Sequence, residues 1–448
     1  MQLVLILMTM HSEWIARVID VEGAFLQGKF TDGEEIYIEV PDGFEQFYDK
    51  EKEWLQVMVP MYGTKQAGLC FYKQLVAKVK DRDYERSKAD PCLYFVWKDE
   101  RLSVMVSWVD DIIALGYPKD VEQMEKDLAD AFDCKCEGEL TEYVGSKIDI
   151  ARNSDGLGTV KFTQPVLVQK LEDEFDLPSG KAPKTPATAG QVLVRGDGSG
   201  AIDGKESTKY RSGTALCMFM MQWSRPDIYN ATRGMSRQMA VPRMAHMKAL
   251  LSMMKYVVAT KNRGLVLSPD TLWNGNKSFH FRIHGRSDSD YAANTDDRRS
   301  ISGGRVFLNG APVMFRSATQ KFVTLSVTEA ETAAGVMVAQ DMMYLYRLLL
   351  SIRLQVELPM VLEMDNKGAV DLANNWSVGG RTRHMDVRNF FLRELKDQSP
   401  SLLIVKHVPG DENDADIFTK NTLAAVFERH IPKFVGHDEY MEGKQPEP

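Results

Sequence analysis

The sequence predicts a mixed α and β protein of two or three domains, and three observations support this fold class. At 448 residues the chain is longer than a single hydrophobic core usually serves. Its composition, 44% hydrophobic and 26% charged, is that of a folded globular protein. Strand-like and helix-like periodicities occur together in two blocks, residues 1–177 and 279–431, and a Met-rich helical stretch lies between them.

The first block, residues 1–177, contains both kinds of element. Its opening run, residues 1–10, is apolar but has neither the basic start nor the small-residue cleavage site of a secretory signal, so we interpret it as a buried helix. Residues 34–40 alternate as a strand, and residues 92–116 have the pattern of two or three strands joined by polar turns. Amphipathic helices are expected at 120–132 and 164–177.

The middle of the chain changes character twice. Residues 178–207 are rich in Pro, Gly, Ala and Ser and carry no periodic signal, which predicts a linker or an exposed meander. Residues 208–278 are predicted to be helical. Within them, residues 225–263 carry eight basic residues against the single acid Asp227, although the net charge of the chain is −8. This stretch is either a face that follows phosphates or a solvated helix face, and charge alone does not decide between them.

The last block, residues 279–431, alternates strand-like and helix-like stretches and predicts an α/β domain. Residues 432–448 are polar and contain Pro, which is typical of a frayed tail. No apolar run is long enough to span a bilayer, so no membrane partner is expected.

Acidic residues interrupt the apolar strands of the first block. Asp20 ends the stretch "WIARVID", and Asp110 and Asp111 lie within "VMVSWVDDIIALG". If these strands are neighbours, the carboxylates converge and can bridge two divalent cations, preferably Mg²⁺ because the ligands are hard oxygens. Adjacent strand residues project to opposite faces, so Asp110 is the preferred direct ligand and Asp111 a supporting one. The alternative is an ordinary exposed turn.

Four segments in a fixed order resemble the Ty1/copia-type reverse transcriptases. They are "RVIDVEGAFLQGKFTDGEEIYIEVPDGFE", "PMYGTKQAGLCFYKQL", "DPCLYFVWKDERLSVMVSWVDDIIALG" and "YRSGTALCMFMMQWSRPDIYNATRGMSRQMAVP". The resemblance implies an α+β polymerase palm and the start of a thumb within residues 1–177, with the fingers largely missing. It implies a helical thumb or connection region in residues 208–278.

The resemblance also implies roles for individual residues. Asp20 and Asp110 would be metal ligands of the palm, with Asp111 supporting them. Phe25 would lie against the sugar of the nucleotide, unless it is simply a core residue. Two further residues would contact the nucleotide or template, and the first of them is otherwise only a surface cation: Lys65 and Gln66.

A second set of motifs resembles the RNase H domain of the same polyproteins: "GRSDSDYAANTDDRRSISGG", "LSVTEAETAAG", "LEMDNKGAVDLA" and "DENDADIFTK". The resemblance implies an α/β RNase H-like domain whose catalytic and metal-binding carboxylates are those of Asp288, Glu331, Asp365 and Asp416. Glu329 is two residues from Glu331, and on a helix the two do not share a face, so one of them is expected to be spare. The segment "GGRTRHMDVRNFFLRE" also matches the family.

Five basic residues are candidates for nucleic-acid backbone contacts. Two lie in the basic stretch and three in the segment just quoted, where they contact phosphates or merely cap and solvate a helix: Arg225, Arg237, Arg383, His384 and Arg388.

Taken together, the motifs predict an RNA-directed DNA polymerase with RNase H, using two Mg²⁺ ions at each site, with Mn²⁺ as the alternative ion. The partners implied are RNA and DNA template–primer, deoxynucleoside triphosphates, RNA–DNA hybrid and other Gag or Pol products. Because this chain begins only a helix before Asp20, we expect polymerisation to be weak or absent. The alternative function is that of a degenerate, inactive remnant that binds nucleic acid.

Overall fold

The computed structural model describes residues 1–30, 33–375 and 386–436. The chain forms two compact units, one of Glu13–Leu140 and one that joins Met1–Ser12 to Thr141–Pro448. The break therefore falls at Leu140, and the expected reverse transcriptase block 1–177 contributes to both units.

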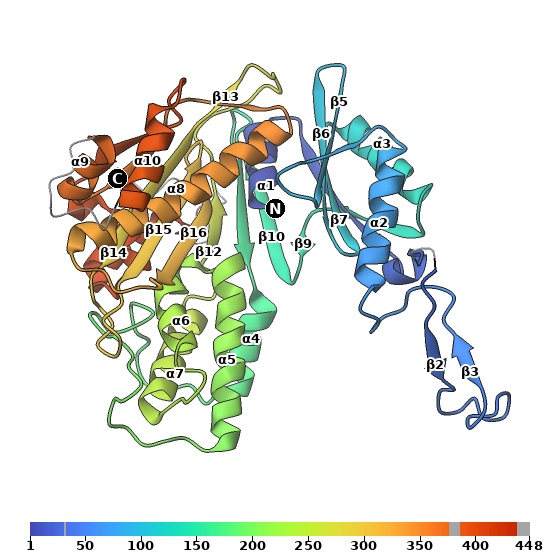
Figure 1. The fold of residues 1–448 in the computed structure, drawn as a ribbon, viewed down its shortest axis with the longest axis horizontal. Coiled ribbons are helices and arrows are strands. Elements are labelled where there is room, and N and C mark those ends of the chain that lie inside the picture. The colour runs from blue at the N-terminus through green and yellow to red at the C-terminus, as the bar shows by residue number, and fades with distance from the viewer. Residues whose placement is uncertain (31–32, 376–385, 437–448) are drawn as a thin grey trace. The chain divides into compact units, whose positions relative to one another are not determined.

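The unit of residues 13–140 is built on a six-stranded sheet in the order β4-β5-β6-β7-β1-β8 (Figure 1). All of its neighbouring strands run antiparallel. Its strands are β1 (Ile15–Val21), β4 (Glu85–Arg86), β5 (Leu93–Lys98), β6 (Arg101–Trp108), β7 (Asp111–Gly116) and β8 (Cys134–Glu139). Its helices are the 3₁₀ helix η1 (Ala24–Gln27), α2 (Ala67–Lys80) and α3 (Pro118–Ala129).

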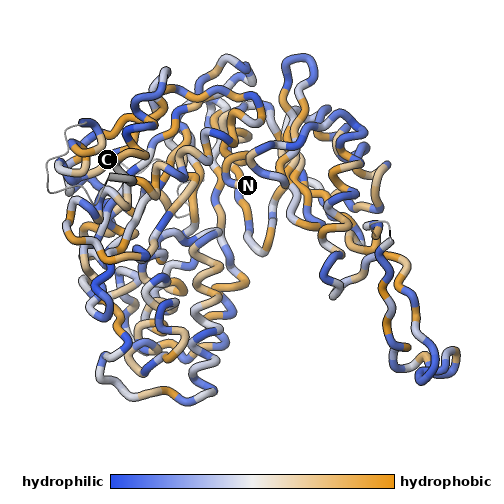
Figure 2. Tube along the Cα trace, in the orientation of Figure 1, coloured by the Kyte–Doolittle hydropathy of each residue, from blue (hydrophilic) through white to orange (hydrophobic). Residues whose placement is uncertain are grey.

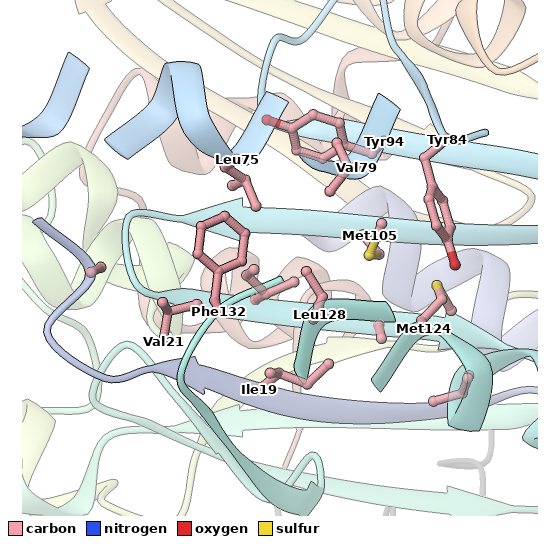
Figure 3. Close-up of a cluster of buried hydrophobic side chains, with 14 of the residues drawn as sticks. Ile19, Val21, Leu75, Val79, Tyr84, Tyr94, Met105, Met124, Leu128 and Phe132 are labelled. Atoms are coloured by element: carbon pink, nitrogen blue, oxygen red, sulfur yellow. The ribbon is translucent and has the colours of Figure 1, made fainter. Parts of the chain in front are cut away.

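Both long helices of this unit bury their apolar stripes against the same face of the sheet (Figure 3). In α3 the stripe is Val121, Met124 and Leu128, and Phe132 follows just beyond the helix, as the apolar spacing of residues 120–132 predicts. Helix α2 contributes Phe71, Leu75 and Val79. From the sheet side the cluster receives Ile19, Val21, Tyr94, Val96, Met105, Ile112 and Ala114.

A small hairpin extends from this unit between η1 and α2 (Figure 1). It pairs β2 (Tyr37–Glu39) with β3 (Trp54–Gln56), so the strand expected at residues 34–40 is present but shorter. Its turn is hydrophilic (Figure 2).

The larger unit contains a five-stranded antiparallel sheet in the order β20-β12-β11-β10-β9. These strands are β9 (Glu142–Tyr143), β10 (Ser146–Arg152), β11 (Gly158–Thr163), β12 (Gly264–Leu267) and β20 (Val435–Gly436). Helix α1 (Gln2–Met10) packs on β11 and β12, and the residues from Leu3 to Met10 are all buried, which confirms a buried helix at the start.

Helices follow this sheet in the chain. Residues 178–203 contain no helix or strand apart from an isolated bridge at Ala201, as expected for the linker. The helices of this region are α4 (Pro165–Glu174), α5 (Gly204–Trp223), η2 (Pro226–Ile228), α6 (Tyr229–Ser236) and α7 (Met244–Ala259). The expectation for residues 208–278 omitted β12, which extends a sheet begun more than a hundred residues earlier. Among the described residues, no helix is both long enough and apolar enough to cross a membrane.

The second sheet of the larger unit has the order β16-β15-β14-β18-β19. Its first three strands are antiparallel, and β18 and β19 add in parallel to the edge of β14. The strands are β14 (Ile283–Asp290), β15 (Ile301–Leu308), β16 (Ala311–Thr319), β18 (Met360–Met364) and β19 (Leu403–His407). A separate short ladder pairs β13 (His280–Phe281) with β17 (Gln355–Val356). This arrangement is the RNase H-like fold expected for residues 279–431.

Helices cover this sheet and carry the chain between its parallel strands (Figure 1). The long helix α8 (Val327–Ser351) lies across β14 and β15. The remaining elements are α9 (Lys367–Asn374), α10 (Asp386–Asp397), η4 (Gly410–Glu412), η5 (Asp414–Phe418), α11 (Ala424–His430) and η6 (Ile431–Lys433).

Two adjacent glycines of β15 allow elements to approach both faces of this sheet. A Cβ at Gly304 would collide with Val338 of α8, and a Cβ at Gly303 would come within 3.0 Å of the backbone of Phe418 in η5. Because neighbouring strand residues face opposite sides, α8 and η5 lie on opposite faces at the same level. Gly303 and Gly304 therefore set how closely α8 and η5 approach the sheet. This matters because α8 carries Glu331 and η5 carries Asp416.

Candidate active site

Three aspartates from separate elements of the larger unit converge at one end of the second sheet. Asp288 lies in β14, Asp365 follows β18, and Asp416 lies in η5. Each offers a carboxylate oxygen within 4.8 Å of the others. Arg286 pairs with Glu363 at the end of the β14–β18 ladder, so Asp288 and Asp365, each two residues further on, lie near one another just beyond it. No other group of three His, Cys, Asp or Glu ligands is this compact in the described part of the chain.

Glu331 reaches the same cluster from the first turns of α8. Its Oε1 accepts hydrogen bonds from the backbone N of Ser289 at 3.2 Å and from its Oγ at 2.9 Å. Glu329 instead stabilises the start of the helix, because its carboxylate accepts from Leu325 N and its own N–H donates to the N-cap hydroxyl, Ser326 Oγ. The geometry therefore favours Glu331 over Glu329 as the fourth acid.

The cluster is electrostatically strained as it stands. Burial, followed by the charges of Asp288 and Asp365, raises the pKa of Glu331. Burial and the charge of Asp288 likewise raise the pKa values of Asp365 and Asp416. Like charges held together away from water favour protonation unless a cation neutralises them.

The donor set fits divalent cations. All four acids offer hard oxygen ligands, and no His or Cys belongs to the group. Glu331 Oε2 is buried and has no hydrogen-bond partner among the described residues. A buried, unpaired carboxylate oxygen beside three aspartates is the arrangement that a bound cation would satisfy.

Two neighbours of Asp416 contact the acids, and neither was a candidate from the sequence. Thr419 donates its hydroxyl to Asp288 Oδ2, and Lys420 Nζ lies 3.0 Å from Asp416 Oδ1 and 3.8 Å from Asp288 Oδ2. Both belong to the quoted stretch "ADIFTK". The three-residue and four-residue spacings from Asp416 would have identified them if the segment had been expected to be helical.

Two buried polar residues at the start of η5, Asn413 and Asp414, hold this element against β14 and β15. Asn413 caps η5 and donates its Nδ2 to the carbonyl of Ser287 at 3.0 Å, directly before Asp288. Asp414 is buried and accepts from Arg305 Nε at 3.0 Å and from Arg286 Nη1 at 3.2 Å. These guanidinium groups hold the pKa of Asp414 far below its usual range despite burial. Asn413 and Asp414 therefore hold η5 in place, and Asp416 lies on this element two residues after Asp414.

The acids predicted for the polymerase converge in the other unit. Asp20 and Asp111 are direct partners across the antiparallel strands β1 and β7, and Val21 N donates to the carbonyl of Asp110 at 3.0 Å. Burial and then the charge of Asp110 raise the pKa values of both Asp20 and Asp111. Among the described residues, however, these three do not form a ligand group as compact as the cluster in the larger unit. Their roles stay predictions.

The turn that carries Asp110 has an unusual backbone. Val109, between Trp108 and Asp110, has a φ of 57°. A β-branched residue is disfavoured in this left-handed region. Because the charge of Asp110 acts on both Asp20 and Asp111, backbone strain and like-charge repulsion coincide at this end of the sheet.

The candidate nucleotide contacts lie near one another in this same unit. Phe25 of η1 packs against Tyr62 with ring centroids 4.6 Å apart, and it is only half-buried. Gln66 precedes α2 and donates its Nε2 to Glu34 Oε1 at 2.8 Å. Lys65 is exposed. Their contacts with nucleotide or template stay predictions.

The prediction that Arg225 contacts the nucleic-acid backbone is wrong. Its side chain is 1% exposed and makes a two-pronged ion pair with buried Asp227, Nε–Oδ1 at 2.9 Å and Nη2–Oδ2 at 2.7 Å. Tyr256 Oη also donates to Asp227. Asp227, the single acid of the basic stretch, is thus the ion-pair partner of Arg225 in the interior.

The other basic candidates have different outcomes. Arg237 is half-buried, with Nη2 3.0 Å from Asp297 Oδ2, and its contact with nucleic acid stays a prediction. Arg383 and His384 lie outside the described residues, as does the side chain of Arg388.

Comparisons with known proteins identify relatives of this chain. Residues 1–189 match the family described as reverse transcriptase (RNA-dependent DNA polymerase). The chain is 30% identical over 415 residues to the retrovirus-related Pol polyprotein from transposon TNT 1-94 of Nicotiana tabacum, covering 92% of this chain and 30% of that protein. It is 28% identical over 421 residues to the Pol polyprotein from transposon RE1 of Arabidopsis thaliana, covering 94% and 27%.

The chain thus spans less than a third of the length of these two relatives. Among solved structures, RNase H1 from the halophilic archaeon Halobacterium salinarum NRC-1 aligns at 16% identity with 31% of this chain and 95% of that one, with a TM-score of 0.23. The matches to the two Pol polyproteins cover more than nine-tenths of this chain. They support the assignment of the chain as a fragment of a copia-type retrotransposon Pol polyprotein, with a reverse transcriptase region followed by an RNase H-like region.

Proposed function

We propose that residues 279–431 are a ribonuclease that cleaves the RNA strand of an RNA–DNA hybrid, with two Mg²⁺ ions held by four acids. One observation carries the proposal: Asp288, Asp365 and Asp416 present oxygens within 4.8 Å of one another, and Glu331 adds a buried oxygen that has no hydrogen-bond partner among the described residues. When bound, the cations would activate a water molecule and stabilise the departing 3′ oxygen.

The chain's own residues have distinct roles in this proposal. The four carboxylates hold the cations, and Ser289 fixes Glu331 through its backbone N–H and hydroxyl. Thr419 orients Asp288 by donating to Oδ2. Lys420 supplies a positive charge beside Asp288 and Asp416 that partly offsets their repulsion.

Cleavage of a labelled RNA–DNA hybrid by the full chain in Mg²⁺ tests this proposal. Asp365→Asn should abolish cleavage because it removes one ligand and leaves the side-chain volume unchanged. Asp371→Asn is the matched control, since Asp371 is exposed on the neighbouring helix α9 and lies outside the cluster. Equal cleavage by the parent and Asp365→Asn, or none by the parent, contradicts the proposal. In the latter case the chain is the inactive nucleic-acid-binding remnant.

The second proposed function is RNA-directed DNA synthesis in the reverse transcriptase region. The family match over residues 1–189 and the pairing of Asp20 with Asp111 beside Asp110 support it. In this proposal the sheet of residues 13–140 is the palm, Asp20 and Asp110 hold Mg²⁺, and residues 208–278 belong to a thumb or connection. Its substrates are RNA or DNA template–primer and deoxynucleoside triphosphates, and other Gag or Pol products are partners.

Primer extension on poly(rA)/oligo(dT) tests the polymerase. Synthesis requires positioning of the triphosphate as well as metal ions. Any synthesis that occurs should disappear in Asp20→Asn and persist in Asp130→Asn, an exposed acid after α3. Extension unaffected by Asp20→Asn, or no extension by the parent, contradicts the proposal.

A further inference from the structure

A cavity of about 50 Å³ adjoins the acid cluster within the larger unit. Thr419 and Lys420, which contact the acids, line one side of it, and α6 lines another. The linker segment 187–193 closes it from a third direction. A ligand in this cavity would therefore touch the same two residues that touch Asp288 and Asp416.

Two arginines of the α6 region line this cavity, and their guanidinium groups meet at one hydroxyl. Arg233 donates to Ser317 Oγ at 3.0 Å, to Thr319 Oγ1 at 3.2 Å and to Asn230 Oδ1 at 2.8 Å. Arg237 donates to the same Thr319 Oγ1 at 3.2 Å, and its other prong reaches Asp297. All three acceptors of Arg233 are neutral, and it forms no ion pair within 4.0 Å among the described residues.

This arrangement is costly without an anion. Burial, followed by the positive charge of Arg237, lowers the pKa of Arg233 to about 10. Asp290 also lines the cavity, but it lies beyond ion-pair distance and its own pKa is raised, chiefly by burial. A largely buried guanidinium that has only neutral partners gains most from a ligand with negative charge and several acceptor oxygens.

The rest of the lining suits a phosphate group. Asn230 and Asn421 hydrogen-bond to one another at 3.0 Å and, with Asn294, surround the arginines with amides that add no charge. A guanidinium fork matches two oxygens of a phosphate in one plane. A cavity of this size can hold one such group.

We propose that Arg233 and Arg237 form a phosphate subsite that takes a backbone phosphodiester of the strand bound at the acid cluster. The proposal rests on the proposed ribonuclease function, because it assigns the anion to the nucleic acid and not to free phosphate. A phosphate fixed by these arginines at a constant offset from Asp288 and Asp416 sets the register of the strand at the acids. The subsite belongs to the helical region before the RNase H-like domain, so that region takes part in choosing the cleaved bond.

Hybrid binding by full-length chains that carry Asp365→Asn, measured by fluorescence anisotropy at constant Mg²⁺ over a range of KCl, tests this subsite. Arg237→Gln should reduce the slope of log affinity against log salt by about 0.9, the contribution of one phosphate contact. Lys248→Gln is the control, because Lys248 is an exposed cation of α7 that does not line the cavity. Equal slopes for these two variants overturn the proposal.

A second variant tests for an increase in affinity for the hybrid and leaves both arginines in place. Asp297→Asn removes the carboxylate that pairs with Arg237, so it should tighten hybrid binding by roughly threefold, as expected when one guanidinium becomes free for phosphate. Asp371→Asn, an exposed acid of the same unit, should not tighten binding to the same extent. If Arg237→Gln fails to fold, the Asp297→Asn result decides alone, and unchanged affinity in that variant overturns the subsite.

A third measurement distinguishes a phosphate of the nucleic acid from free phosphate as the anion bound in the cavity. Inorganic phosphate at millimolar concentration should raise the melting temperature of the chain by less than the hybrid does, and it should not displace the bound hybrid. If phosphate displaces the hybrid in the parent but not in Arg237→Gln, the cavity is a free-anion site and the assignment to nucleic acid is overturned. Because these readouts measure binding, loss of cleavage in the parent would contradict the ribonuclease while leaving the subsite result intact.

Discussion

Arg305 of β15 and Asp414 of η5 form a buried two-pronged ion pair, with Nε–Oδ1 at 3.0 Å and Nη2–Oδ2 at 3.2 Å. Asp414 lies two residues before Asp416, whose carboxylate belongs to the acid cluster, yet it faces a different set of partners. Lys433 and Arg286 complete its surroundings. The pair thus attaches η5, which carries Asp416, to β15. Strand β15 lies beside β14, which carries Asp288.

Replacing Asp414 tests this attachment. Asp414→Asn leaves the buried guanidinium of Arg305 without its carboxylate, so it should lower the free energy of unfolding by about 3 kcal/mol. Since Asp416 would then be held less firmly, the Mg²⁺ concentration required for half-maximal cleavage should rise. Thermal melts and Mg²⁺ titrations of cleavage measure the two effects. A variant with the parent's melting temperature and Mg²⁺ requirement would show that the pair does not position Asp416.

The response of stability to Mg²⁺ should depend on pH. The pKa of Glu331 is raised from 4.5 to about 9 and that of Asp416 from 3.8 to about 7. Raised values mean that the protonated forms stabilise the folded chain at low pH and that this contribution is lost as the pH rises through the folded values. Mg²⁺ replaces the protons, so its gain in melting temperature should be larger at about pH 8 than at about pH 6.

The control for this pH dependence is Asp365→Asn, which removes a ligand and one of the charges that raise the pKa of Glu331. Its gain in melting temperature from Mg²⁺ should be small at both pH values. The interpretation fails if the parent gains equally at both pH values, or if the variant gains as much as the parent.

The close approach of α8 to β15 predicts a steric effect. Gly304→Ala would place a Cβ against Val338 and 2.8 Å from the carbonyl of Arg286. Because α8 carries Glu331, the variant should lose about 1–3 kcal/mol of stability and much of its cleavage activity. Gly196→Ala, whose Cβ would meet nothing within 4 Å, should change neither. Melting temperatures that differ by less than a degree between the two variants would refute the packing argument.

The strained turn before Asp110 predicts a stabilising substitution. Val109→Gly removes a β-branched side chain from a φ of 57°, so it should raise the stability of the unit of residues 13–140 by about 1 kcal/mol. Val59→Gly is the matched control at an exposed position outside the positive-φ set, and it should be neutral or destabilising. Urea unfolding followed by tryptophan fluorescence measures both. Loss of stability in Val109→Gly would mean that the turn is not strained.

The motifs selected acids that lie on separate elements, and the structure shows which of these acids lie close together. The order of the elements then brought Asp288, Asp365 and Asp416 together, and Glu331 could be preferred over Glu329 from helix periodicity and the matching motif. Burial of Arg225 was not predictable from charge, because it depends on the three-dimensional pairing with Asp227 and Tyr256. The boundary at Leu140 was not predictable for a similar reason. The strands that follow it belong to the larger unit because β11 pairs with β12, which lies a hundred residues later in the sequence.

The burial of α1 against β11 and β12 has a consequence for synthesis of the chain. Its apolar residues are translated before the strands that cover them: β11 follows only after residues 13–140, and β12 after a further hundred residues. During that interval the nascent chain exposes a helix that is apolar on all sides. The intervening unit can fold in the meantime, so efficient production of this protein should depend on a chaperone that shields residues 2–10 until β11 and β12 emerge.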